Sequence, residues 1–218
     1  MNTKSSAASG PSWTEVILGA FLSILLGATL AAVFLVLKPV QITKAPPADE
    51  ERKAGEVYYI EGSRNASNLR ALQQKQADFF AGQSVRFTEE ELNFLVAPAP
   101  AAKAPAEAEN MLSAGTPNFR IADDLLQIGV PLNLNVLGYA PTIVAQVRGT
   151  FVRSDHVFAL EPSEFYIGSC PLHRIPGAAP YVLRKLIQSA AVPEEAAVAW
   201  GNLSDVSVQG RTLQLTMP

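Results

Sequence analysis

The chain has 218 residues, of which 48% are hydrophobic and 17% charged, and its formal net charge is −3. This balance lacks the basic surface typical of nucleic-acid-binding proteins, so no nucleic-acid partner is expected. The single cysteine, Cys170, excludes an intramolecular disulfide. Without an apolar N-terminal segment and its flanks, about 160 residues remain, which suits one domain of ordinary size.

The apolar segment covers residues 16–37 and contains no charged residue and no proline. A helix of about 22 residues spans roughly 33 Å, enough to cross the hydrocarbon core of a bilayer. A cleavable signal peptide is the alternative, but its apolar core is usually about 7–15 residues long. We therefore expect an uncleaved transmembrane helix, preceded by a disordered tail over residues 1–15 and followed by a linker over 38–56.

Small residues recur every four positions within this segment, at Gly19, Ser23, Gly27 and Ala31. Such a stripe lets a second membrane helix approach closely, so these residues are candidates for contact with a partner helix or a second copy of the chain. The alternative is that small residues are simply common in membrane helices.

The charges that flank the segment favour a cytoplasmic domain. Lys38, Lys44, Arg52 and Lys53 follow it, whereas Lys4 precedes it. The positive-inside rule places the side richer in Lys and Arg in the cytoplasm. Long domains, however, cross the membrane largely regardless of charge, so the count alone leaves the orientation open.

The first part of the expected domain, 57–218, alternates short strands and helices. A strand is expected at 57–60 and a helix over 65–80, with Ser63, Asn65 or Ser67 as its N-cap. The sequence Thr88-Glu89-Glu90-Glu91 then predicts a helix that begins with a capping box. We interpret the three acids as a solvated helix start rather than a metal or catalytic cluster.

Long strands dominate the second part, after a flexible Ala/Pro loop at 97–108. Apolar residues alternate with polar ones from residue 126 to 136 and again from 143 to 151, which predicts strands with one apolar face. A third strand is expected over 157–167, with turns at Asp123-Asp124 and Ser154-Asp155. Short turns between long strands indicate an antiparallel meander. A helix over 180–189 and a closing hairpin over 206–217 complete the domain.

Signals for catalysis are weak. Cys170 and His173 are three residues apart, but two ligands do not make a metal site. No P-loop, dinucleotide fingerprint or nucleophile elbow is present. We therefore predict no catalytic residue, no metal and no cofactor, and an enzyme is only the third functional hypothesis.

Two segments resemble the bacterial YpmS-like and LmeA-like membrane-anchored domains. The segments are FTEEELNFLV and FYIGSCPLHRIPGAAPYVLRKLI, and the resemblance covers roughly residues 57–218. It implies an extracytoplasmic domain with a long curved sheet around a helix, related to tubular lipid-binding proteins, and no catalytic residue. The matching positions are Thr88, Glu89, Glu91, Leu92 and Asn93, then Ile167, Gly168, Pro171, Leu172 and Pro176.

The expected fold is therefore α+β: a single N-terminal transmembrane helix, then a curved antiparallel sheet meander with helices packed on its apolar face. The first functional hypothesis is a single-pass inner-membrane protein whose extracytoplasmic domain binds lipid or lipid-linked material in an apolar groove. The second is an accessory subunit of a larger membrane complex. The candidate groove residues are Leu126, Ile128, Val130, Leu132, Leu134, Val136, Leu183 and Ile187.

Overall fold

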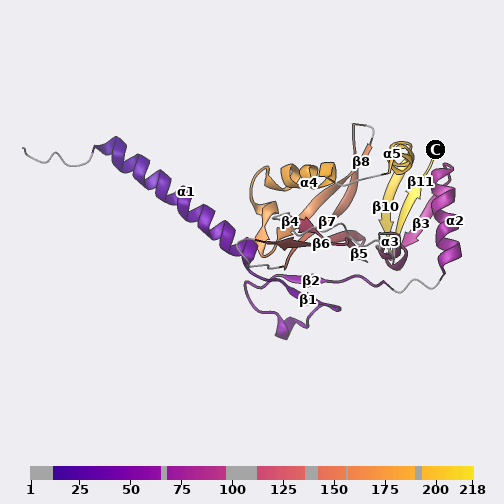
Figure 1. Cartoon of the computed structure of the whole chain (residues 1–218), viewed down its shortest axis with the longest axis horizontal. Coiled ribbons are helices and arrows are strands. Elements are labelled where there is room, and N and C mark those ends of the chain that lie inside the picture. Colours follow the sequence, from indigo (N-terminus) through magenta and orange to yellow (C-terminus); the bar gives the residue numbers. More distant parts are fainter. Residues whose placement is uncertain (1–11, 65–67, 97–111, 136–141, 156, 190–192) are drawn as a thin grey trace, which may run out of the picture. The chain divides into compact units, whose positions relative to one another are not determined.

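The computed structural model describes residues 12–64, 68–96, 112–135, 142–155, 157–189 and 193–218. It divides into two compact units, Met1–Leu35 and Val36–Pro218, which are described separately (Figure 1). The Ala/Pro loop predicted over 97–108 and most of the predicted tail lie outside the described residues.

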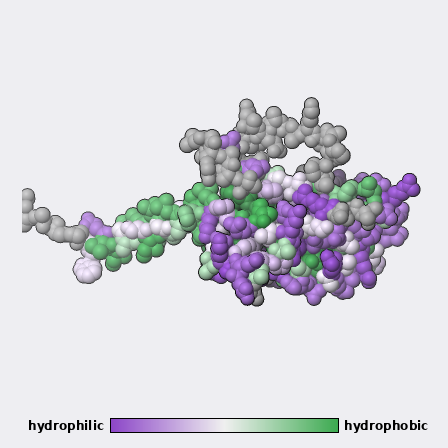
Figure 2. Space-filling view, turned by 90° about the horizontal axis from the view of Figure 1, so that it is seen from below, coloured by the Kyte–Doolittle hydropathy of each residue, from purple (hydrophilic) through white to green (hydrophobic). Residues whose placement is uncertain are grey.

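The first unit consists of the apolar helix α1, Trp13–Leu37, whose last two residues belong to the second unit. It begins three residues earlier than the apolar segment because Ser12 and Glu15 cap it: the Ser12 amide donates to the Glu15 carboxylate at 2.8 Å. Within the described residues, α1 is the helix whose length and composition allow it to cross a membrane, and none of its residues is buried. Figure 2 shows hydrophobic residues along its length.

The second unit begins with a small parallel sheet of β1, Gln41–Thr43, and β2, Tyr58–Ile60. The one-turn helix η1, Asp49–Glu51, lies between them. The Gln41 amide donates to the Val57 carbonyl and the Glu61 amide to the Thr43 carbonyl. The stretch expected as a linker, 38–56, is thus paired with the domain and belongs to the same compact unit.

The largest sheet is antiparallel and has the order β4-β6-β7-β8-β9, with β5 also paired to β6. The turn predicted at Asp123-Asp124 is confirmed, because both residues have positive φ and join β5 to β6. Pro131 lies in β6 between the stretches that pair with β4 and with β5, so its missing amide falls in a gap of the ladder. The strands are β4 Leu112–Ala114, β5 Asn118–Ala122, β6 Leu125–Leu134, β7 Thr142–Ser154, β8 Val157–Ile167 and β9 Cys170–Pro171.

A register shift interrupts the pairing of β7 with β8 at Arg148/Gly149, opposite Pro162. The proline has no amide to donate to the ladder, and the chain bulges there. The Ser163 hydroxyl donates to the Arg148 carbonyl at 3.0 Å. Gly149 is required because a Cβ at this position would overlap the backbone carbonyl of Glu161.

A second antiparallel sheet has the order β10-β11-β3. The predicted closing hairpin is confirmed as β10, Asp205–Gln209, and β11, Thr212–Thr216. Its third strand, β3, Val85–Thr88, comes from a distant part of the chain and pairs with β11. The remaining helices are α2 Leu69–Phe80, α3 Glu89–Leu95, η3 Leu172–Arg174, α4 Ala178–Ser189 and α5 Glu194–Gly201.

The helix starts follow local chemistry. The N-cap of α2 is Asn68, whose side chain accepts from the Ala71 amide at 3.1 Å, so the cap predicted at Ser63, Asn65 or Ser67 is wrong. The capping box of α3 is confirmed by hydrogen bonds in both directions between Thr88 and Glu91.

Two clusters of buried hydrophobic residues in the described part of the chain both involve the largest sheet. The first, the main core, joins Leu126 of β6 and Phe158 of β8 to residues of α2, α5 and all three strands of the second sheet. The second, the Val36 cluster, consists of Leu132, Ile143 and Ala145, with Val36, Val130, Leu134 and Ile167 packed against it.

Candidate functional site

The candidate groove residues on β6 share one face of the strand but lie in different clusters. Leu126 is 2% exposed in the main core, and Ile128 packs against the same core. Leu132 lies in the Val36 cluster with Val130 and Leu134. Leu126 and Leu132 are six residues apart, roughly 20 Å along a strand. The apolar face is therefore divided into a half filled by the main core and a half at the Val36 cluster.

Helix α4 carries the other two candidates. Leu183 is half-buried, and neither of the two clusters includes it. On the same helix Ala179 is buried, whereas Tyr181 is 67% and Leu186 36% exposed. The side chain of Ile187 and the whole of Val136 lie outside the described residues. Among the described residues, then, α2 packs in the main core, but α4 adds no residue to the Val36 cluster.

The polar alternation suggests that the opposite face of the largest sheet is open to solvent. In the structure, part of this face is covered. Tyr59 of β2 lies against Gly129 of β6 and is only 3% exposed. Its hydroxyl donates to the Asn118 side chain at 3.1 Å. Burial, together with the negative charge of Glu61, raises the pKa of Tyr59 to about 12. Gly129 permits this close approach because a Cβ there would overlap the tyrosine ring.

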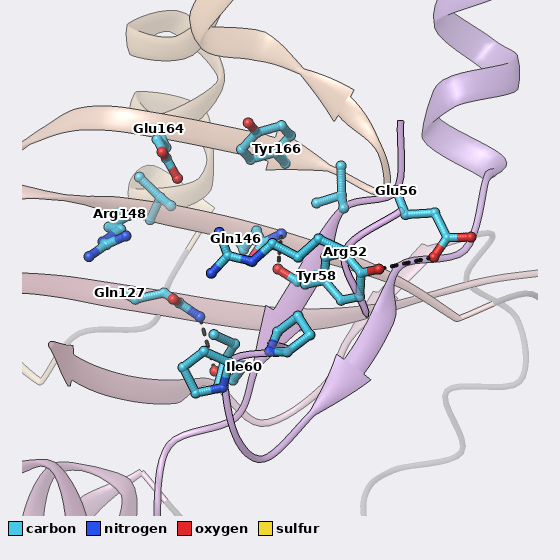
Figure 3. Close-up of a pocket in the computed structure, with 13 residues that line it drawn as sticks. Arg52, Glu56, Tyr58, Ile60, Gln127, Gln146, Arg148, Glu164 and Tyr166 are labelled. Atoms are coloured by element: carbon cyan, nitrogen blue, oxygen red, sulfur yellow. Dashed lines mark hydrogen bonds between the residues drawn. The ribbon is translucent and has the colours of Figure 1, made fainter. Parts of the chain in front are cut away.

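A pocket of about 370 Å³ lies beside Tyr59, between this polar face and the segment 46–60 (Figure 3). The Gln127 side-chain amide donates to the Ile60 carbonyl at 3.1 Å, and the Gln146 side-chain amide donates to the Tyr58 carbonyl at 3.4 Å. These two bonds hold β2 against the large sheet and form the floor of the pocket. The other labelled side chains around it are Arg52, Glu56, Arg148, Glu164 and Tyr166.

The pocket carries charges of both signs and phenol groups, but the residues that line it include no histidine, cysteine or serine. Burial and the nearby Glu164 raise the pKa of Tyr166, so its hydroxyl stays protonated at neutral pH. Arg148 already pairs with Asp123 at 2.6 Å. Such a set can hydrogen-bond a polar molecule.

The acids at the start of α3 have a role that the sequence did not indicate. Glu89 accepts hydrogen bonds from the amides of Ser63, at 2.6 Å, and Ile121, at 2.8 Å. Glu91 pairs with Lys75 at 2.7 Å. The prediction of a solvated helix start is wrong for these residues, because two separate backbone segments use the carboxylate of Glu89.

Two buried asparagines extend this attachment. Asn93 of α3 is 1% exposed and donates to the carbonyls of Ser63 and Phe119, while its carbonyl oxygen accepts from the Phe119 amide. Asn118 bonds both backbone groups of Gly62 in the same way. Together they join α3, β5 and the segment after β2, and periodicity gives no signal for such contacts.

The sequence predicts no metal site, and Cys170 and His173 are a weak pair of candidate ligands. No group of three or more His, Cys, Asp or Glu side chains that could hold a metal occurs in the part of the chain that the structure describes. Cys170 is free and buried, and burial raises the pKa of its thiol. The Nδ1 atom of His173 lies 3.2 Å from the backbone nitrogen and oxygen of Phe165, and its ring contacts Tyr166.

The stripe on α1 is exposed throughout, at Gly19, Ser23, Gly27 and Ala31. A Cβ added at Gly19 or Gly27 would meet nothing within 4 Å. The space that a closely packed partner helix would need is present, and the partner itself stays a prediction.

Comparison with known proteins gives no relative for this chain. No protein-family model, no curated protein and no solved structure matches it.

Proposed function

We propose that this chain is a membrane-anchored, non-catalytic domain that binds the acyl part of a lipid or lipid-linked molecule beside the Val36 cluster. The observation that carries the proposal is a second aliphatic cluster on the apolar sheet face, separate from the main core. The Leu126 half packs with α2, α5 and the second sheet, whereas α4 contributes no described residue to the Leu132 half. Half-buried aliphatic side chains at Val130, Leu134 and Leu183 suit a hydrocarbon chain.

Chain connectivity supports a lipid as the occupant. Val36 directly follows the unit formed by the apolar helix and packs on the cluster. Along the chain, the apolar helix therefore ends within a few residues of this cluster. The curvature of the sheet and the packing of helices across it, which the family resemblance implies, belong to the same proposal.

The same resemblance places the domain outside the cytoplasm of a bacterial inner membrane, against the charge count. Single cysteines at Ser5 and at the exposed Glu194 test this with a membrane-impermeant maleimide on intact cells. The unmodified chain gives the baseline, because Cys170 is buried. We expect labelling at position 194 only. Labelling at position 5 only would reverse the topology.

Native mass spectrometry of the full chain, extracted in mild detergent, tests lipid binding. The double variant Leu134→Gln with Leu183→Gln removes an apolar group that packs against the Val36 cluster and a half-buried one on α4. The matched control, Leu69→Gln with Val198→Gln, makes the same chemical change at two exposed positions. Because each lost apolar contact weakens binding by about 1–2 kcal/mol, the first variant should retain at least tenfold less lipid.

Three results would contradict the proposal: no lipid on the wild-type chain, equal lipid loss in both variants, or equal retention in both. A wild-type chain that carries another protein and no lipid would favour the accessory-subunit hypothesis instead.

A further inference from the structure

A second hollow, of about 840 Å³, is lined by Gly62 and by residues at the end of β5. We call it the cationic hollow. Three chain segments that are distant in sequence line it: residues 61–64, the end of β5 from Arg120 to Asp123, and the Gly210-Arg211 turn of the β10–β11 hairpin. Lys44, just after β1, and Glu89 of α3 complete the lining.

Hydrogen bonds fix these walls relative to one another. The Asp124 carboxylate accepts from the Gly210 amide at 2.8 Å, which ties the β5–β6 turn to the β10–β11 turn. Glu89 ties Ser63 to Ile121, as described above. The backbone walls of the hollow are therefore tied together by two carboxylate side chains.

The hollow has an excess of unpaired positive charge. Lys44, Arg64, Arg120 and Arg211 line it, and among the described residues none of them forms an ion pair. Of the acids beside them, Asp123 pairs with Arg148, whereas Glu61 and Glu89 keep their negative charges, although the Glu89 carboxylate also accepts two backbone amides. Four cations against these two carboxylates leave an excess of two positive charges. This is a local positive site on a chain whose net charge is −3.

We propose that the cationic hollow binds a phosphate-bearing anion. Guanidinium groups present forked donors that match phosphate oxygens, and three of the four cations are arginines. The volume lies within the range of small-molecule sites, about 300–1,000 Å³. The phosphate belongs either to a soluble compound or to the headgroup of an anionic lipid. The inference does not rest on the proposed acyl site, whose residues do not line this hollow.

The test uses the full chain and two double variants. Arg120→Gln with Arg211→Gln removes two forks from the hollow. Arg70→Gln with Arg86→Gln is the control, since it removes the same charge at two exposed positions that do not line it. Inorganic phosphate is titrated calorimetrically into each protein in a neutral detergent. In parallel, each protein is placed in nanodiscs of phosphatidylcholine with phosphatidylglycerol, and retained phosphatidylglycerol is measured by native mass spectrometry.

We expect the hollow variant to bind phosphate at least about tenfold more weakly than the wild type and the control. A parallel loss of phosphatidylglycerol identifies a lipid headgroup as the source, and unchanged phosphatidylglycerol identifies a soluble phosphate compound. Equal behaviour of the two variants, or no phosphate binding by the wild type, would overturn the inference. A loss of bound lipid in the Leu134→Gln/Leu183→Gln variant alone would bear only on the proposed acyl site.

Discussion

Replacing Asn93 with leucine is expected to cost about 3–9 kcal/mol of the free energy of unfolding, because each of three backbone groups left unpaired costs about 1–3 kcal/mol. The leucine has nearly the same volume but cannot bond the Ser63 carbonyl or the two backbone groups of Phe119. A domain with a total stability of about 5–15 kcal/mol would then be close to unfolded. Urea unfolding of the detergent-solubilised chain, followed by the fluorescence of Trp200 in the main core, measures the loss.

Asn202→Leu is the control, since this asparagine is exposed at the end of α5. It should change the stability by about 0.5 kcal/mol or less, as exposed substitutions usually do. If Asn93→Leu is as mild as the control, the asparagine network does not join α3 to β5 in the way described.

Gly149→Ala is expected to lower the free energy of unfolding by about 3 kcal/mol or more. The added methyl group would meet the backbone carbonyl and Cα of the opposite strand at Glu161 and Pro162, and backbone atoms cannot rotate out of the way. The overlap can be relieved only if β7 and β8 separate at the bulge. These strands pair along most of their length, so the separation is costly. The same unfolding experiment gives the magnitude.

Gly201→Ala provides the comparison, because a Cβ there would meet nothing within 4 Å. At the end of α5, alanine should be neutral or slightly stabilising, by up to about 1 kcal/mol. A Gly149→Ala protein with wild-type stability would show that the register shift between β7 and β8 is not as described.

Local chemistry made parts of this fold predictable. The apolar helix, the capping box at Thr88, the turn at Asp123-Asp124 and the closing hairpin all depend on residues a few positions apart. Alternation along residues 126–134 likewise predicted which side of that strand is apolar. These signals describe what a segment forms and which face it buries.

Long-range pairing was not predictable from the same signals. Nothing in the residues of β3 indicates that it joins β11, or that β1 pairs in parallel with β2. Alternation shows that a face is buried without showing what covers it. The eight groove candidates were therefore one undivided set in the sequence, although Leu126 lies in the main core and Leu132 in the Val36 cluster.

The polar pocket and the cationic hollow were missed for a related reason. Gly129 and Gly62 are the signals in the sequence, since each stands where another part of the chain approaches closely. Their meaning depends on Tyr59 and on Phe119, which are distant in sequence. The arginines of the hollow come from separate segments, so no run of basic residues marks it.

Photo-cross-linking with a diazirine-bearing phospholipid tests the central proposal most directly. The full chain is reconstituted with this lipid and irradiated, and the adducts are mapped on its peptides. Adducts on α1 are expected in any membrane-spanning chain. Acyl binding beside the Val36 cluster predicts further adducts within Val130–Leu134 and on α4 around Leu183, and none at Leu126. Adducts confined to residues 13–37 would contradict the proposal.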